Sequence, residues 1–338
     1  MLSLVCVVDS ILIFQLNFHT TNIDYKECSI AWVNINMKTS NKIINLNQWH
    51  TSGDYFDFHG QQIFYRVKGE GVPLLLIHGY PTASFDWGKV WPQLSETFHC
   101  ITLDMLGFGF SDKPQQSYSI FTQADIYCAL IKKLGIKYCH IISHDYGDTV
   151  AQELLARQNE KTLPFKIKTS HLLNGGIFPE THRPVLMQKL LLSPLGGLLV
   201  RLMSKKTLAK NLQKIFGPNT LPSTQEVTDF WSLIRYNNGH LVMHKLISYI
   251  VERRVNRARW VGALQHTKIP LRLTNGLFDP ISGAHLVTRY QQLIPNADVI
   301  CLKDIGHYPQ IEDPNGVVAA QLDFITPEGV NRFSTQVK

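Results

Sequence analysis

Short runs of consecutive apolar residues recur along most of the chain, and they restrict its fold more than any other feature. Residues 74–77 (LLLI) show no alternation of apolar and polar side chains. Such a run predicts a strand that is covered on both faces, as in a parallel sheet. Similar runs recur at 100–103, 139–142, 171–173, 271–274 and 299–302. Two further segments, 55–58 and 63–67, surround His59-Gly60 and are typical of an antiparallel pair.

Segments with the periodicity of a helix lie in several of the gaps between these runs. The helix-like segments are 121–134, 147–157, 284–293 and 316–324. Strands that alternate with helices predict an α/β fold with a mostly parallel, doubly wound sheet. The alternation stops between about residues 176 and 262, where Leu-rich, helix-like pieces are separated by prolines. We therefore expect an inserted helical cap above the carboxyl ends of the strands, where ligands bind in such sheets.

These elements divide the chain into a core, a cap and two terminal segments. The core comprises 51–176 and 262–326, the cap 177–261 and the C-terminal tail 327–338. Residues 1–50 are interpreted as a leader and linker, with 20–50 rich in Asn, Ser, Thr and Lys and of low order. The first 18 residues are mostly apolar and are a candidate membrane anchor. Asp9 within them would cost about 2.5–3.5 kcal/mol in that role.

The charge of the chain excludes some partners. Its formal net charge of +7 is modest and is interpreted as a solvated surface. Arg253, Arg254, Arg257 and Arg259 lie close together, but no basic stripe interleaved with aromatic residues accompanies them. We therefore predict no nucleic-acid partner. The cysteines include no C-x-x-C pair, and neither a metal nor a cofactor is predicted. Composition leaves the oligomeric state open.

The segment Ser143-His144-Asp145-Tyr146-Gly147 joins an apolar run to a helix-like segment. This outline is typical of a nucleophile elbow, a sharp strand-to-helix turn that presents one side chain and leaves backbone N–H groups free. The apex here is Asp145, whereas the common version has serine. An apex carboxylate forms an ester with an electrophilic carbon. As a lone residue, Asp145 could equally cap the helix that follows it.

Other motifs fall where an elbow enzyme needs them. Asp279 ends the penultimate strand and His307 follows the last one, so the order nucleophile, acid, histidine matches that of elbow hydrolases. Taken singly, Asp279 could be a turn residue and His307 a structural histidine. The loop that contains Tyr80 follows an apolar strand. Its N–H and that of Tyr146 could together hold an oxyanion.

Four motifs carry a resemblance to a known family. They are LGFGFSDKP at 106–114, SHDYGD at 143–148, NGGIFPETHRP at 174–184 and RWVGAL at 259–264. The region from about 53 to 324 resembles an α/β-hydrolase of the epoxide hydrolase and haloalkane dehalogenase branch. The last two motifs, at the edges of the cap, resemble one animal branch of that family more closely. That resemblance implies association with the endoplasmic reticulum membrane and a hydrolase activity on an unsettled substrate; a cytoplasmic location is the alternative.

The resemblance implies a reaction in two steps. Asp145 would attack a carbon to form an alkyl ester, and His307, oriented by Asp279, would activate water to hydrolyse it. Opening an epoxide also needs a proton donor, which related hydrolases take from cap tyrosines. Tyr236 and Tyr249 are the candidates, although each could be an ordinary amphipathic cap residue. The Leu- and Phe-rich cap favours a small apolar, lipid-derived substrate.

Three other functions compete with this hypothesis. A dehalogenase would need N–H donors for a halide, usually from Trp, but Tyr146 and Tyr80 occupy the two nearby positions. An acyl-serine esterase is disfavoured because Ser143 lies two residues before the apex, where it would pack beneath the turn. The third is a membrane-associated binding or scaffold protein with little or no turnover.

Overall fold

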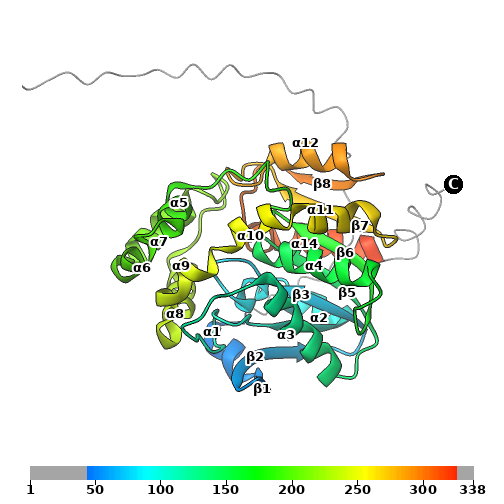
Figure 1. Cartoon of the computed structure of the whole chain (residues 1–338), viewed down its shortest axis with the longest axis horizontal. Coiled ribbons are helices and arrows are strands. Elements are labelled where there is room, and N and C mark those ends of the chain that lie inside the picture. The colour runs from blue at the N-terminus through cyan, green and yellow to red at the C-terminus, as the bar shows by residue number, and fades with distance from the viewer. Residues whose placement is uncertain (1–43, 326–338) are drawn as a thin grey trace, which may run out of the picture.

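An eight-stranded sheet organises the computed structural model, which describes residues 44–325 (Figure 1). The strand order is β1-β2-β4-β3-β5-β6-β7-β8. β2 pairs antiparallel with β1 and β4, and all the other pairs are parallel. The strands are β1 (Asp54–Phe58), β2 (Gln61–Lys68), β3 (Val72–Ile77), β4 (Phe98–Leu103), β5 (Tyr138–His144), β6 (Lys166–Leu173), β7 (Leu271–Gly276) and β8 (Asp298–Leu302). Each predicted strand is confirmed.

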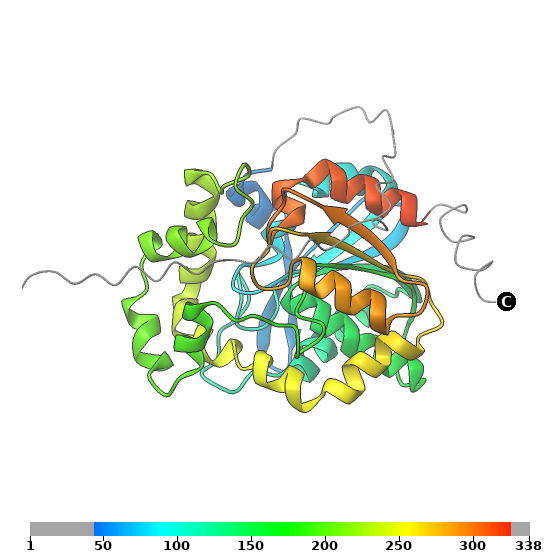
Figure 2. The same cartoon turned by 90° about the horizontal axis from the view of Figure 1, so that it is seen from above.

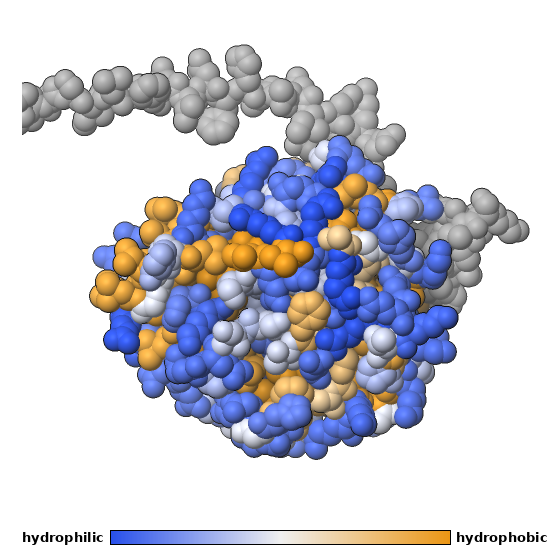
Figure 3. Space-filling model, viewed as in Figure 1, coloured by the Kyte–Doolittle hydropathy of each residue, from blue (hydrophilic) through white to orange (hydrophobic). Residues whose placement is uncertain are grey.

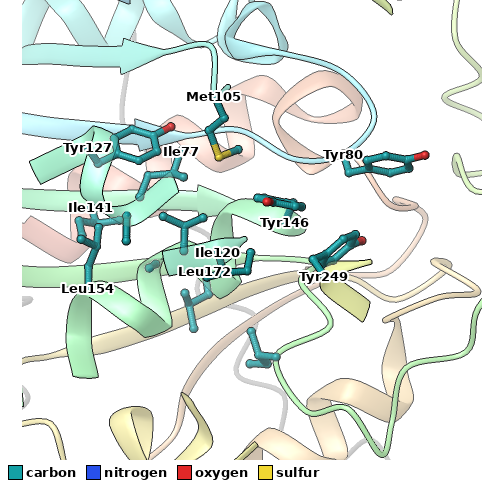
Figure 4. Close-up of a cluster of buried hydrophobic side chains, with 14 of the residues drawn as sticks. Ile77, Tyr80, Met105, Ile120, Tyr127, Ile141, Tyr146, Leu154, Leu172 and Tyr249 are labelled. Carbon is teal, nitrogen blue, oxygen red and sulfur yellow. The ribbon is translucent and has the colours of Figure 1, made fainter. Parts of the chain in front are cut away.

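The apolar run in β3 is buried on both faces, as its lack of alternation predicts. Leu75 and Ile77 belong to one cluster of buried side chains, while Leu74 and Leu76 belong to a second. Successive side chains of a strand point to opposite faces, so the two clusters lie on opposite faces of the sheet. Figure 4 shows part of the first cluster, in which Ile77 lies beside Tyr127 and Ile141.

Helices cover both faces of the sheet. Those that contribute to the first cluster include α3 (Ile120–Lys133), α4 (Tyr146–Asn159), α11 (Arg257–His266) and α12 (Ala284–Leu293). Those that contribute to the second include α2 (Trp91–Thr97) and α14 (Pro314–Ile325). Two short helices, η1 (Ser84–Trp87) and α13 (Pro309–Glu312), follow β3 and β8. The four predicted core helices and the doubly wound architecture are confirmed.

A helical cap is inserted between β6 and β7 and lies together at one side of the molecule (Figures 1 and 2). It contains α5 (Leu186–Leu192), α6 (Gly196–Leu199), η2 (Val200–Leu202), α7 (Lys205–Gln213), α8 (Thr224–Arg235), η3 (Tyr236–Val242), α9 (Met243–Leu246) and α10 (Tyr249–Val255). α11 then returns to the core, where Trp260 and Arg259 both donate hydrogen bonds to Glu153 on α4. The RWVGAL motif therefore joins the end of the cap to the helix behind the elbow.

Residues 44–50 differ from the predicted linker, because they lead into and form most of a short helix, α1 (Leu46–Thr51). Asn45 and Gln48 form a capping box at its start. Trp49 is fully buried against Trp91, with ring centroids 5.1 Å apart, and donates to Ser84 Oγ. The contacts of the buried Trp49 side chain therefore hold this segment of polar composition in place. The rest of the predicted leader lies outside the described residues, and within 44–325 every helix is too short or too polar to cross a bilayer.

Candidate active site

Asp145 stands at a strained corner between β5 and α4. Its φ of 47° and ψ of −104° lie where residues with a Cβ are rarely found, and strain of this kind is concentrated at functional sites. The corner is tightly packed. A Cβ on Gly147 would lie 2.3 Å from the carbonyl oxygen of Ile77, so only glycine allows α4 to start so close to β3.

The carboxylate of Asp145 is almost fully buried, with three donors around it. The backbone N–H of Tyr80 donates to Oδ2 over 3.1 Å, and the hydroxyl of Tyr249 lies 3.4 Å from Oδ1. Arg253 Nη2 is 3.6 Å from Oδ1. Burial alone would raise the pKa of Asp145, but the charges of His307 and Arg253 and the Tyr80 N–H hold it below its ordinary value. The side chain is therefore ionised at neutral pH, as a nucleophile must be.

His307 and Asp279 form a buried pair in which Nδ1 of His307 is 2.7 Å from Oδ2 of Asp279. Asp279 also accepts hydrogen bonds from Ser282 Oγ, the Ile281 N–H and Asn174 Nδ2. Burial would raise the pKa of Asp279, but His307 and these donors lower it to about 2. Burial likewise opposes the charged form of His307, and the carboxylates of Asp279 and Asp145 outweigh it and raise its pKa to about 9. The pair is thus an imidazolium and a carboxylate at neutral pH.

Backbone and amide contacts hold these groups in place. His144, beside the apex, contacts the carbonyl oxygen of His307 through Nε2 at 2.7 Å. Asn174, at the end of β6, accepts a hydrogen bond from the Gly276 N–H and donates to Asp279. The structure therefore brings together Asp145, Asp279 and His307 from the ends of three strands. Sequence reasoning did not identify Asn174 as a site residue, although it begins the NGGIFPETHRP motif.

Arg253, one of the four clustered arginines, is not a surface residue. Its side chain is only 2% exposed, and it extends from α10 to the elbow. Nη2 donates to the carbonyl oxygen of Asp145 over 2.9 Å, and Nε donates to Thr149 Oγ1 over 2.6 Å. The guanidinium also lies over the ring of Tyr249. Arg253 links the cap to Asp145, and its place in the RRVNRARW sequence gave no separate signal for this role.

Two of the remaining arginines of the cluster also bind within the molecule. Arg257 pairs with Glu180, and Arg259 pairs with Glu153 and Glu160. Arg254 is exposed at the surface. Three of the four side chains therefore bind different partners within the molecule, and the cluster does not form one basic stripe.

The structure separates the two candidate cap tyrosines. Tyr249 is 1% exposed and lies over Asp145, with its ring 4.7 Å from that of Tyr146 (Figure 4). Tyr236 instead packs in a separate aromatic group with His50 and Phe110. Of the two candidate tyrosines, the structure therefore places only Tyr249 beside Asp145. Tyr80 was predicted to contribute only its backbone N–H. Its side-chain hydroxyl is also buried, like that of Tyr249, and has no hydrogen-bond partner among the described residues.

The predicted oxyanion donors lie on the two sides of Asp145. The Tyr80 N–H already contacts the carboxylate, and the N–H of Tyr146 opens the first turn of α4, where it has no acceptor within the helix. Ser143, the competing nucleophile, is fully buried and donates to Asp148 Oδ1 over 2.5 Å, beneath the turn. In residues 44–325, no group of three His, Cys, Asp or Glu side chains is placed to hold a metal ion.

Comparison with known proteins agrees with this architecture. The family model described as alpha/beta hydrolase fold matches residues 72–314. The human mesoderm-specific transcript homolog protein is 46% identical over 293 residues, covering 83% of this chain and 88% of the relative. A Mycobacterium tuberculosis relative named as a hydrolase, LipZ, is 35% identical and covers 83% of this chain and 98% of its own length.

Among solved structures, the epoxide hydrolase CorEH superposes with a TM-score of 0.69 at 20% identity and covers 82% of this chain and 99% of its own. At that identity the likeness establishes the fold alone. The animal relatives at 46% identity match the branch that the cap-edge motifs predicted. The chain belongs to the α/β-hydrolase fold family and, within it, to the group of mesoderm-specific transcript proteins.

Proposed function

We propose that this protein hydrolyses an epoxide on an apolar, lipid-derived substrate, with Asp145 as the nucleophile. The observation that supports this most is the buried, ionised carboxylate of Asp145 beside the His307–Asp279 pair. A carboxylate at the elbow attacks an electrophilic carbon, and a strained three-membered ring provides such a carbon without a separate leaving group. The solved epoxide hydrolase of the same fold adds support at the level of architecture.

In the first step, an oxygen of Asp145 forms a bond to one ring carbon while the bond from that carbon to the ring oxygen breaks. The electron pair moves to the ring oxygen, which takes a proton from a nearby donor. The hydroxyl of Tyr249, 3.4 Å from Asp145 Oδ1, is the donor that we assign, and the unpartnered hydroxyl of Tyr80 would supply a second hydrogen bond. The product of this step is an ester between Asp145 and a hydroxyalkyl group.

In the second step, water adds to the carbonyl carbon of that ester, and His307 takes the proton of the water. Negative charge develops on an oxygen of Asp145, where the N–H groups of Tyr80 and Tyr146 can receive it. The carbon–oxygen bond to the alkyl alcohol then breaks, and the proton held by His307 passes to the departing alcohol. The diol leaves, and the proton that remains on the carboxyl group of Asp145 passes to the phenolate that Tyr249 became in the first step. Asp145 is then again a carboxylate, one oxygen of which comes from water, and Tyr249 is again a hydroxyl.

The charge of Asp145 also explains how His307 can become a base. In the free protein that charge helps to keep the pKa of His307 at about 9, so the imidazole is protonated. Formation of the ester removes the negative charge of Asp145 and one of the causes of the raised pKa. His307 therefore gives up its proton more readily when the ester is present, at the stage when a base is needed.

Labelling from solvent tests the proposal. The full chain is incubated with a long-chain terminal epoxide in water enriched in oxygen-18, and the peptide that contains Asp145 is analysed by mass spectrometry. We expect diol product and heavy oxygen in Asp145 after many turnovers. A protein that makes no diol and leaves Asp145 unlabelled would instead support the alternative function, a membrane-associated binding or scaffold protein.

A matched pair of tyrosine variants tests the proton donor. Tyr249→Phe should lower kcat for epoxide opening by about 10²-fold, because general acid help is worth roughly 10²–10⁴-fold and Tyr80 remains to assist. Tyr236→Phe should change kcat by less than about twofold, since its ring packs with His50 and Phe110. Single-turnover formation of the Asp145 ester is the measurement. Equal rates in the two variants would contradict the assignment of Tyr249.

A further inference from the structure

The first part of the cap has an unusual charge distribution. Residues 181–225 contain no Asp or Glu. Their basic side chains are Arg183, Lys189, Arg201, Lys205, Lys206, Lys210 and Lys214. These seven residues account for the entire formal net charge of +7, so the rest of the chain is balanced. The net positive charge is therefore concentrated in one segment of the fold, which its interpretation as a solvated surface did not predict.

The same segment exposes several large apolar side chains. Leu186, Leu195, Leu198 and Leu202 are 70%, 62%, 59% and 71% exposed, and Leu190 is 39% exposed. Leu186 and Leu190 lie on α5, Leu195 directly precedes α6, and Leu198 and Leu202 lie on the continuous turns of α6 and η2. Figure 3 shows hydrophobic side chains gathered at the edge of the molecule where Figure 1 places these helices. Single exposed leucines are common in proteins, but a cluster on one short stretch indicates an interaction surface.

Basic and apolar residues share the same helical faces. On α5, Lys189 lies three residues after Leu186 and directly before Leu190. The pattern repeats on the next turns, where Arg201 follows Leu198 by three residues and precedes Leu202. Residues three and four apart are neighbours on a helix surface. Lys189 and Arg201 are both exposed, so each can reach a negatively charged surface while the leucines beside it enter an apolar layer.

We propose that this cap patch, made of Leu186, Lys189, Leu190, Leu195, Leu198, Arg201 and Leu202, docks the protein on the surface of an anionic lipid bilayer. Leucines flanked by Lys and Arg, without acidic residues, are the combination that binds the interface of anionic membranes. A second copy of the chain is a poorer occupant, because it would bring a second set of positive charges against the first. Docking does not depend on turnover by Asp145, so it stands apart from the proposed hydrolase activity.

The cap patch and the residues that contact Asp145 belong to one inserted segment. The helices of the cap patch belong to the same inserted layer as α10, which carries Tyr249 and Arg253 to the elbow. α5 packs against α9, the helix that precedes α10. This geometry gives the cap two roles, one toward the membrane and one toward Asp145.

Vesicle co-sedimentation of the full chain tests the cap patch. Wild-type protein should bind vesicles of phosphatidylcholine with phosphatidylserine more tightly than vesicles of phosphatidylcholine alone, and added salt should remove the difference. Leu198→Ser with Leu202→Ser should reduce binding to both vesicle types by about tenfold or more. Lys189→Gln with Arg201→Gln should reduce only the preference for phosphatidylserine, by roughly fivefold per charge.

Matched controls lie outside the cap patch. Val255→Ser removes a side chain that is 78% exposed at the end of α10, and Lys132→Gln with Lys133→Gln neutralises two exposed charges on α3. These variants should bind like the wild type, and circular dichroism should show that all the variants are folded. Equal binding by patch and control variants would overturn the proposal and assign docking to another part of the chain. A patch that instead mediates dimers in light scattering, with no vesicle binding, would overturn it as well.

Discussion

A His307→Gln protein supplied with a terminal epoxide should become modified on Asp145 and remain so. Alkylation of Asp145 does not need His307 as a base, because Arg253 and the Tyr80 N–H, which also lower the pKa of Asp145, remain in the variant. Hydrolysis of the ester does need a base, and removing it should slow that step on the order of 10²–10⁴-fold. Intact-mass spectrometry should show one added substrate mass per chain, and peptide mapping should place it on Asp145.

The control for this experiment is a histidine outside the site. His266 lies on the exposed side of α11 and contacts the carbonyl oxygen of Gly262. His266→Gln should turn over the epoxide at the wild-type rate and accumulate no adduct. Modification of a residue other than Asp145, or full turnover by His307→Gln, would contradict the two-step mechanism.

The sheet was predictable because its strands leave a strong local signal. The run at 74–77 is apolar throughout, and the run at 139–142 is interrupted only by His140, since β3 and β5 are covered on both faces. α1 was missed because its order depends on Trp49 reaching Trp91 and Ser84, two partners distant in the sequence. A segment of polar composition gives no sign of such a contact.

The positions of Asp145, Asp279 and His307 were predictable from chain order, because each directly follows a strand of the same sheet. The carboxyl ends of parallel strands meet at one edge, so topology brings the three residues together. Arg253 and Tyr249 were harder to place, because they reach the site through the packing of cap helices. Helical periodicity indicates which face of a helix is apolar, but it does not fix how that helix is oriented above the elbow.

Asp145→Asn should abolish epoxide hydrolysis, with a loss on the order of 10⁴-fold or more, because the nucleophile of the first step is gone. The fold should survive. Asparagine has the same shape, and its amide oxygen can still accept the Tyr80 N–H, while Arg253 keeps its bonds to the backbone of residue 145 and to Thr149. Thermal unfolding should therefore shift by only a few degrees. Retained turnover would show that another group is the nucleophile.

The same variant should change the protonation of His307, and this effect can be measured without any substrate. The negative charge of Asp145 is one cause of the raised pKa of His307, so its removal should bring that pKa below the value of about 9. Asp279→Asn removes the charge that lies nearest to His307, 2.7 Å from Nδ1, and that is the largest cause of its raised pKa, so this variant should lower the pKa further. Titration of the imidazole by NMR gives the two values. An unchanged pKa in Asp145→Asn would mean that the two side chains are not electrostatically coupled, and the proposed change of His307 from acid to base on ester formation would fail.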